Sequence, residues 1–380
     1  MSFSQEEIKA AVISASPSKS ETIAQIIDAF EHYHPQYSLN ITFYSNARYK
    51  QDIESFIEQT DYDVVQLQAG KRLTQYIDSN KLTQLDPLID TAQISHDYPQ
   101  STLHHMSNKQ GHLFAVPLAI YSWGFYYNKA VFKKNNLEIP NTWSEFLSIC
   151  QTLSSKNIIP IVQANKENWE ALAWLDFLLL KQGGVELRNK FINQQPLSIH
   201  KSKQVINPLM QLVNKKYIYT PDEKWGWDQS ISAVYRGVAA MTLTGMFTEG
   251  KLSESNDKNI GFFPFPESKG TIAPLDVLAI PNSSKNKKGA SALLSFLSQR
   301  EIHSKSSIGI GWLPALKSQN NLVLPQRQQS ILAHLQNSTV LVPYLDKEIS
   351  SSRAQNVNNA LNNLLLHNAQ PDLIDLLQNK

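Results

Sequence analysis

At 380 residues the chain is too long for one compact core, and we expect two lobes. Its 42% hydrophobic and 18% charged residues are typical of a folded globular protein and exclude a disordered one. The 35 basic and 33 acidic residues leave a formal net charge of +2, which does not indicate a nucleic-acid or acidic membrane partner. The longest apolar candidate for a membrane span, residues 171–180, is too short to cross a bilayer.

The residue types that carry catalysis or bind metals do not form a recognisable motif. The single cysteine, Cys150, excludes an internal disulfide, and its place on the apolar face of a predicted helix favours burial over reactivity. We find no phosphate loop, no HExxH motif and no cysteine-rich set. His104 and His105 are adjacent, so their side chains diverge and do not predict a metal site. We therefore expect neither a cofactor nor a metal.

The first eighty residues alternate between apolar strands and amphipathic helices. Ser18 and Glu21 have the spacing of a capping box before the first helix. The predicted strands span residues 8–14, 39–43 and 62–67. This order predicts a sheet of largely parallel strands, in which ligands bind beyond the carboxyl ends of the strands. The loops at those ends, residues 14–16, 45–48 and 66–71, are therefore candidates for ligand contact.

The stretch of residues 114–134 organises the rest of the chain. An apolar strand is interrupted by Pro117, and an aromatic cluster of residues 121–127 follows, with Asn128 placed to cap the next helix. One interpretation is a core strand with a proline kink. The other is a hinge, where the chain leaves one lobe, lines a cleft and enters a second lobe.

Residues 142–228 predict a second set of strands and helices. Thr142 and Glu145 form a capping box, and a strand over residues 158–162 leads into a loop that carries Trp169. A long apolar helix follows, with predicted breaks at residues 183–184 and at Pro208. Trp225 and Trp227 flank a glycine, and such a tryptophan pair marks either a recognition surface or core packing.

The last third of the chain adds three short strands, a glycine–proline crossing at residues 309–314 and a predicted amphipathic helix over residues 352–380. No polar linker separates two independent domains. Several proline-marked crossings without a linker fit two lobes that exchange strands.

Four segments resemble, in order, the extracellular solute-binding proteins of ABC importers, in the carbohydrate-binding branch that includes the maltose-binding protein. They are Phe30-Glu31 with Pro35; Asp63-Val64-Val65 with Asn80-Lys81-Leu82 and Leu85-Asp86; residues 114–145; and residues 237–245. The resemblance covers nearly the whole chain. It implies an α/β fold of the periplasmic-binding-protein type, with two lobes joined by crossing hinge strands and a cleft between them. The lobes implied are residues 1–118 with 272–315, and 119–271 with 316–380.

The resemblance also implies which positions line the cleft. Phe247 stands where the family often has a sugar-stacking tryptophan, and Leu275 and Asp276 stand where it has small residues. Together with the loop and aromatic candidates above, the expected ligand-binding residues are Ser16, Arg48, Gln66, Gln68, Lys71, Tyr121, Trp123, Trp169, Trp225, Trp227, Asp228, Thr244, Gly245, Phe247, Asp276 and Trp312.

These residue types suit a sugar, because aromatic planes cover its C–H faces and carboxylates or amides bind its hydroxyls. The resemblance implies a monomeric, non-enzymatic protein that delivers a mono- or oligosaccharide to a membrane permease, in the periplasm or outside the cell. No signal peptide is visible, so either the protein is cytoplasmic or a leader has been removed, and the resemblance alone implies the second. Two alternatives stay open: a sensor that signals to a membrane receptor or kinase, and a binder of another polar solute. A glycosidase with paired Asp228 and Asp276 is not supported by any motif.

Overall fold

The chain forms two compact units, and each unit is assembled from two separate segments. Unit 1 combines Met1–Tyr121 with Pro274–Val323, and unit 2 combines Ser122–Ala273 with Leu324–Lys380. The chain therefore passes between the units three times, after Tyr121, Ala273 and Val323. The computed structural model describes residues 5–13, 20–59, 62–167, 169–221, 224–252, 258–318 and 322–379.

Unit 1 contains a five-stranded sheet with the order β2-β1-β3-β11-β4. The first three strands are parallel, as the alternation of strand and helix predicts, whereas β11 pairs antiparallel with both β3 and β4. The strands are β1 (Glu6–Ile13), β2 (Tyr37–Tyr44), β3 (Val64–Gln68), β4 (Ala115–Ile120) and β11 (Leu275–Ala279). The helices are α1 (Ser20–Tyr33), α2 (Asn46–Glu58), α3 (Lys71–Asp78), α4 (Thr91–Asp97), α5 (Gln100–His104), α12 (Lys287–Ser298) and α13 (Arg300–Gly309).

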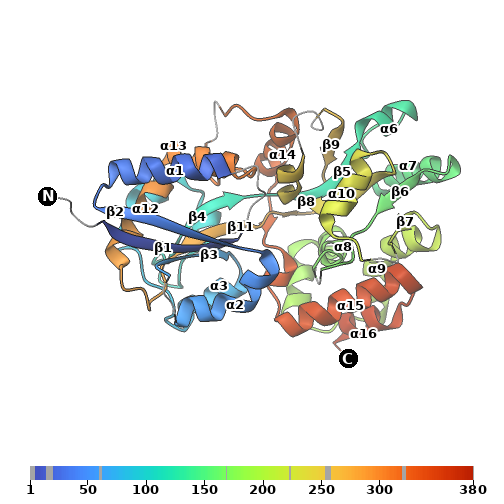
Figure 1. Cartoon of the computed structure of the whole chain (residues 1–380). Coiled ribbons are helices and arrows are strands. Elements are labelled where there is room, and N and C mark those ends of the chain that lie inside the picture. The colour runs from blue at the N-terminus through green and yellow to red at the C-terminus, as the bar shows by residue number, and fades with distance from the viewer. Residues whose placement is uncertain are drawn as a thin grey trace. The chain divides into compact units, whose positions relative to one another are not determined.

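Helices cover both faces of this sheet. Helices α1, α12 and α13 lie on one face, and α2 and α3 lie on the other (Figure 1). Strand β3 is apolar and buried over most of its length, which is typical of a parallel strand covered on both faces. The core of unit 1 therefore lies in two layers, and the carboxyl end of β3 carries the polar side chains of Gln66 and Gln68.

Pro117 does not interrupt its strand, contrary to the prediction. Strand β4 runs from Ala115 through Pro117 to Ile120, and the register with β11 is irregular between Asp276 and Val277. The strand can continue because β4 lies at the edge of the sheet, where a residue without an N–H group need not break a second ladder.

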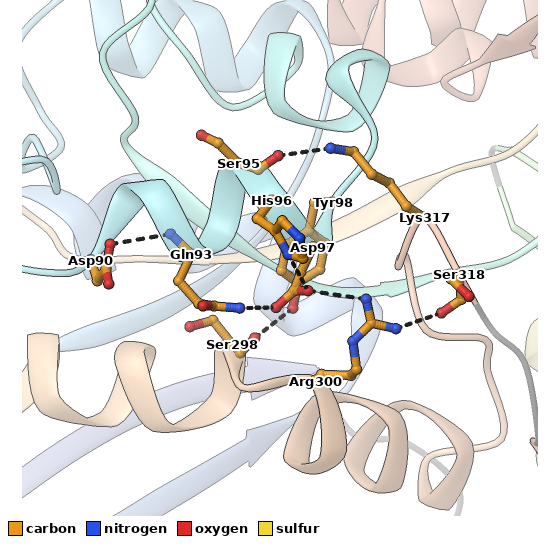
Figure 2. A network of polar contacts seen from close by, with 10 residues as sticks. All are labelled: Asp90, Gln93, Ser95, His96, Asp97, Tyr98, Ser298, Arg300, Lys317 and Ser318. Carbon is orange, nitrogen blue, oxygen red and sulfur yellow. Dashed lines mark hydrogen bonds and ion pairs between the residues drawn. The ribbon is translucent and has the colours of Figure 1, made fainter.

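A polar cluster around Asp97 holds the last segment of unit 1 in place (Figure 2). The Asp97 carboxylate accepts hydrogen bonds from the Gln93 amide and from Arg300 Nη2 (3.0 Å), and the Asp97 carbonyl accepts from the Lys317 amide (2.9 Å). Burial alone would raise the pKa of Asp97, but the Gln93 and Arg300 donors lower it below its usual value. Arg300 Nη1 also donates to the Ser318 carbonyl (2.9 Å), so the chain after α13 is tied to α4 and α13.

Unit 2 contains a five-stranded sheet with the order β7-β6-β8-β5-β9 and a two-stranded sheet of β10 and β12. The strands are β5 (Trp123–Asn128), β6 (Ile159–Val162), β7 (Ile218–Tyr219), β8 (Ala239–Gly245), β9 (Ile260–Phe263), β10 (Thr271–Ile272) and β12 (Leu341–Val342). The helices are α6 (Lys129–Lys134), α7 (Trp143–Ser155), α8 (Leu172–Ile192), α9 (Ile199–Asn214), α10 (Trp227–Tyr235), η2 (Met246–Lys251), α14 (Gln326–Asn337), η3 (Leu345–Lys347), α15 (Ser351–His367) and α16 (Pro371–Gln378).

The core of unit 2 is rich in aromatic rings. Phe265 stacks on Phe177 of α8 with ring centroids 4.7 Å apart, and it also lies against Phe125 of β5. Trp174 is fully buried, as its position in the apolar helix predicted, and Trp143 is buried as well. Thr142 and Glu145 form the predicted capping box at the start of α7. Of the aromatic residues of β5, Phe125 therefore belongs to this core, whereas Trp123 contacts the ring of Phe247.

Two helix predictions in unit 2 need correction, and a third is confirmed. Pro208 lies inside α9 and does not end it, because the buried face of the helix, including Pro208 itself, continues to pack on both sides of the proline. The predicted break at residues 183–184 is confirmed, because α8 has a kink at Gly184, which leaves helical geometry with φ +62°. The predicted tail helix is two helices, because Asn368 adopts a left-handed conformation after α15. Within the described ranges, no helix is long and apolar enough to cross a membrane.

Candidate functional site

In unit 1, two glutamines of β3 converge on one buried carboxylate of β11. Gln68 lies opposite Asp276 in the antiparallel pairing, and Gln66 points to the same face of the sheet because it is two residues away. Gln66 Nε2 donates to Asp276 Oδ2 (2.6 Å), and Gln68 Nε2 donates to Asp276 Oδ1 (3.0 Å). Gln66 Oε1 accepts from the Ile13 amide at the end of β1 (2.9 Å), which fixes the orientation of that side chain.

An aromatic pair adjoins this amide–carboxylate group. The hydroxyl of Tyr121 accepts a hydrogen bond from Gln68 Nε2 (2.9 Å). The ring of Trp312 stacks on Tyr121 with centroids 5.2 Å apart and an interplanar angle of 29°. The structure thus brings five of the predicted residues together in unit 1. We call these five residues the polar group: Gln66, Gln68, Tyr121, Asp276 and Trp312.

The other candidates in unit 1 do not join the polar group by any contact that we identify among the described residues. Arg48 lies on the exposed side of α2 and forms an ion pair with Asp52 one turn later. Lys71 is exposed at the start of α3. Ser16 lies outside the described residues, as does Ser18 of the predicted capping box.

In unit 2, four predicted aromatic residues lie together, with three tryptophans around the ring of Phe247 in η2. The ring of Phe247 contacts Trp123 (5.5 Å between centroids), Trp169 (5.4 Å) and Trp227 (5.1 Å), each at an edge-to-face angle above 70°. These residues come from β5, the loop after β6, η2 and the first residue of α10. Trp169, Trp227 and Phe247 are half-buried, so their rings are available to a ligand. We call these four residues the ring group.

Gly245 and Thr244 at the end of β8 shape the floor under the ring group. A Cβ atom on Gly245 would lie 2.4 Å from the Phe247 ring and 3.0 Å from Trp123, so the glycine allows both rings to approach the backbone. Thr244 is buried and lines a small cavity together with Trp123, Trp169 and Trp227. Both residues were predicted, and both act here through close packing against the rings.

Trp225 and Asp228 have supporting positions in the same region. The Trp225 amide donates to Asn165 Oδ1 (3.0 Å), and its carbonyl accepts from the amides of Asn165 (2.9 Å) and Lys166 (3.1 Å). Trp225 therefore fixes the loop that leads to Trp169. Asp228 lies in the first turn of α10, where a negative charge is favourable, next to Trp227.

Two residues beside the ring group were not predicted. Tyr344 stacks on Trp123 with centroids 4.5 Å apart and an interplanar angle of 7°, and its hydroxyl donates to the Trp169 carbonyl. Glu170 is buried and lines the small cavity. A signal for Tyr344 existed in the sequence, because residues 340–344 repeat the pattern of apolar strand, proline and aromatic residue seen near Pro117. Glu170 could have been suspected from its place beside Trp169.

Two buried ion pairs support the segments that carry these rings. Arg327 of α14 donates through Nε (2.7 Å) and Nη2 (2.6 Å) to the Glu249 carboxylate of η2, which also accepts from the Tyr126 hydroxyl (3.1 Å). Arg188 of α8 binds Asp176 through Nε (2.6 Å) and donates to the Pro343 carbonyl next to Tyr344 (2.6 Å).

Burial raises the pKa of Asp176, and the adjacent Arg188 charge opposes this shift. In the part of the chain that the structure describes, no group of three or more histidine, cysteine, aspartate or glutamate residues could hold a metal ion. The chemistry of the two groups is therefore that of hydrogen bonding and aromatic packing.

Comparison with known proteins gives a consistent result. The sequence pattern of the family described as bacterial extracellular solute-binding protein matches residues 15–302. An uncharacterized ABC transporter extracellular-binding protein of Pyrococcus horikoshii is 26% identical over 290 residues, which is 74% of this chain and 64% of that protein. A multiple sugar-binding protein of Streptococcus mutans is 27% identical over 202 residues, covering 49% of this chain and 48% of its own length. The chain thus spans less than two thirds of these relatives.

Solved structures show the same fold. A bacterial solute receptor described as having an exclusive preference for β-D-galactopyranose has a TM-score of 0.88 at 18% identity, covering 99% of this chain and 97% of its own. A solute-binding protein in complex with raffinose has a TM-score of 0.82 at 18% identity, covering 98% of each chain. These matches confirm the predicted α/β fold of the periplasmic-binding-protein type. The family match spans well over half of the sequence, and the chain belongs to the bacterial extracellular solute-binding proteins.

Proposed function

We propose that this chain binds a carbohydrate outside the cytoplasm and delivers it to the permease of an ABC importer, without catalysing a reaction. The observation that carries the proposal is the ring group of unit 2. Three of its rings are half-buried and meet edge to face, which leaves part of the apolar ring surface exposed. The C–H faces of a pyranose pack well against such surfaces.

The polar group of unit 1 supports the same ligand class. A sugar carries hydroxyls around its rim, and carboxylates and amides bind hydroxyls through strong hydrogen bonds. The carboxylate of Asp276 is held in one orientation by hydrogen bonds from Gln66 and Gln68. Trp312 and Tyr121 add a stacked aromatic surface next to these acceptors.

The similar proteins favour a sugar over an amino acid or a polyamine. The Streptococcus mutans relative is named for binding multiple sugars, and the two solved structures are described with galactopyranose and raffinose. The Pyrococcus horikoshii relative is named for an ABC transporter. By the family's description this is an extracellular binding protein, and we expect it to act as a monomer.

The test is a ligand panel read by intrinsic tryptophan fluorescence and by thermal shift. The panel contains D-galactose, D-xylose, maltose, raffinose, diacetylchitobiose, several amino acids and spermidine. We expect at least one sugar to raise the melting temperature, because a ligand that binds only the native state stabilises it by mass action. If only an amino acid or spermidine binds, the proposal that the ligand is a sugar is overturned. If no compound of the panel binds, the proposal that the chain delivers a small solute is overturned.

Matched variants separate binding by the ring group from a general effect on folding. Phe247→Ala removes the ring that contacts three tryptophans, and we expect it to weaken sugar binding by tenfold or more. Tyr33→Ala removes an aromatic ring that is 70% exposed at the end of α1, and it should leave the affinity unchanged. Stimulation of ATP hydrolysis by the reconstituted permease then distinguishes an importer component from a sensor.

A further inference from the structure

A small cavity in unit 2 has polar atoms in its wall that lack partners. Its volume is about 10 Å³, which is close to the space that one water-sized oxygen occupies. Trp123, Trp227, Thr244 and Glu170 are among the residues that line it. The cavity therefore adjoins the ring group and can hold one hydroxyl oxygen.

Glu170 presents a carboxyl oxygen in this wall. The residue is 3% exposed, and its Oε2 accepts a hydrogen bond from the Glu167 amide (2.9 Å). Among the described residues, Oε1 is buried and has no hydrogen-bond partner, and the same is true of the indole Nε1 of Trp123. Two residues that line one cavity thus carry a buried acceptor and a buried donor, and leaving such atoms unsatisfied is costly.

The protonation state of this carboxyl is also unusual. Burial raises the pKa of Glu170 to about 7, and the nearby backbone amides of Glu167, Trp227 and Lys166 only partly oppose this effect. Other titratable groups lie on the elements around the cavity, whereas β8 contributes only uncharged residues. They are Lys166 and Glu167 on the same loop, Tyr126 and Tyr127 on β5, Asp228 and Tyr235 on α10, and Tyr344 after β12.

We propose that Glu170 is a specificity-determining residue of the binding site, where its free oxygen Oε1 accepts a hydrogen bond from one hydroxyl of the bound sugar. The Trp123 indole N–H lies in the same wall and donates to that hydroxyl oxygen. One hydroxyl can act as donor and acceptor at once, so it satisfies both atoms. The inference rests on the proposed function, because it requires that a sugar binds beside the ring group.

The inference has a direct consequence for the dependence of affinity on pH. A hydroxyl donates more strongly to a carboxylate than to a neutral carboxyl, so the sugar binds the ionised form preferentially and lowers the pKa of Glu170. Binding is then complete above the pKa of the empty protein, near 7, and weakens as the pH falls below it. Between pH 8 and pH 6 the affinity should drop roughly tenfold, and binding at pH 7 should release about half a proton.

The experiment measures the affinity of the best sugar of the panel by titration calorimetry from pH 5.5 to 8.5, in buffers of different ionisation enthalpy. Glu170→Gln keeps the shape of the side chain but cannot ionise. This variant should bind at every pH about as weakly as the wild type at pH 6, and it should release no proton. Glu167→Gln is the matched control, since it removes the neighbouring carboxyl but not the one in the cavity, and it should keep the pH dependence.

Each outcome decides between the two ideas. A sugar that binds the wild type with the same affinity at pH 6 and pH 8 overturns the role of Glu170 and leaves the proposed function intact. A pH dependence that persists in Glu170→Gln assigns the titration to another group and also overturns it. If no sugar binds at any pH, the proposed function fails and this inference fails with it. Should Glu170→Gln not fold, proton release by the wild type still supports or refutes the inference.

Discussion

The two units hold their candidate binding residues in place by different means. In unit 1, the residues that would contact a ligand also orient one another, because Gln66 and Gln68 both bond to Asp276. In unit 2, the rings pack against one another, and the ion pair of Arg327 with Glu249 fixes η2, the segment that carries Phe247. In unit 1, the residues proposed to contact the ligand also hold one another in place. In unit 2, other residues hold the proposed ligand-contacting rings in place. Substitutions should couple stability and affinity in the first unit and separate them in the second.

The largest effect is expected from Arg327→Met in unit 2. The side chains of Arg327 and Glu249 are 1% and 4% exposed, so the substitution leaves a buried carboxylate without its counter-charge. We expect a loss of about 3–5 kcal/mol in the free energy of unfolding, measured in urea. Sugar affinity, measured on the fraction that remains folded, should fall much less.

The double variant Glu249→Leu with Arg327→Met provides the control for that prediction. Replacing both charges by apolar groups should return stability to within about 1–2 kcal/mol of the wild type, because no buried charge is left. If the double variant regains stability but still cannot bind any sugar, the ion pair would belong to recognition and the contrast between the units would disappear.

Asp276→Ala should have the next largest effect, and here affinity and stability should fall together. The substitution removes the acceptor of two glutamine amides, one of them buried. We expect the affinity for the sugar to fall roughly 100-fold, since hydrogen bonds to a charged group contribute about 1.5–3 kcal/mol each. Asp78→Ala, at an exposed position at the end of α3, should change neither quantity.

Gly245→Ala should give a smaller loss, confined to the ring group. The new Cβ atom would lie 2.4 Å from the Phe247 ring, so the ring must move. We expect a destabilisation of about 1–3 kcal/mol and a several-fold weaker affinity. Gly111→Ala is the comparison, because it strains a backbone with φ +87° but meets no atom within 4 Å, and it should reduce stability without reducing affinity.

Arg48→Ala should have the smallest effect. The side chain is 63% exposed and pairs with Asp52 within one helix, so its contribution to stability should be below about 0.5 kcal/mol. We expect the affinity to stay within twofold of the wild type. If calorimetry showed that the affinity falls tenfold or more, Arg48 would have to be counted among the residues that bind the ligand.

The sequence predicted the fold class and, in unit 1, the residues of the polar group, for two different reasons. Gln66 and Gln68 followed from a general rule, because they end a buried strand of a parallel sheet. Asp276 lies far away in the sequence on an antiparallel strand, so only the family resemblance could place it with them. Arg48 also met the general rule, but it pairs with Asp52 on its own helix instead.

The candidate site of unit 2 was predicted less completely, because it depends on contacts for which the sequence has only weak signals. Tyr344 reaches Trp123 after a strand of only two residues, which is too short to show a periodic pattern. Pro208 was misjudged because packing outweighs the local preference of proline. Glu170 was overlooked, since a single carboxyl in a loop does not reveal its burial.

The place of β11 in the sheet of unit 1 also has a consequence during synthesis on the ribosome. Strand β11 lies between β3 and β4, and β4 has no other partner in the sheet. All of unit 2 up to Ala273 must therefore leave the ribosome before the sheet of unit 1 can close. Until then one edge of β3 is unpaired and open to association with other chains. A nascent chain stalled just before Leu275 should be a substrate for chaperones, whereas one stalled well beyond Ala279 should resist proteases.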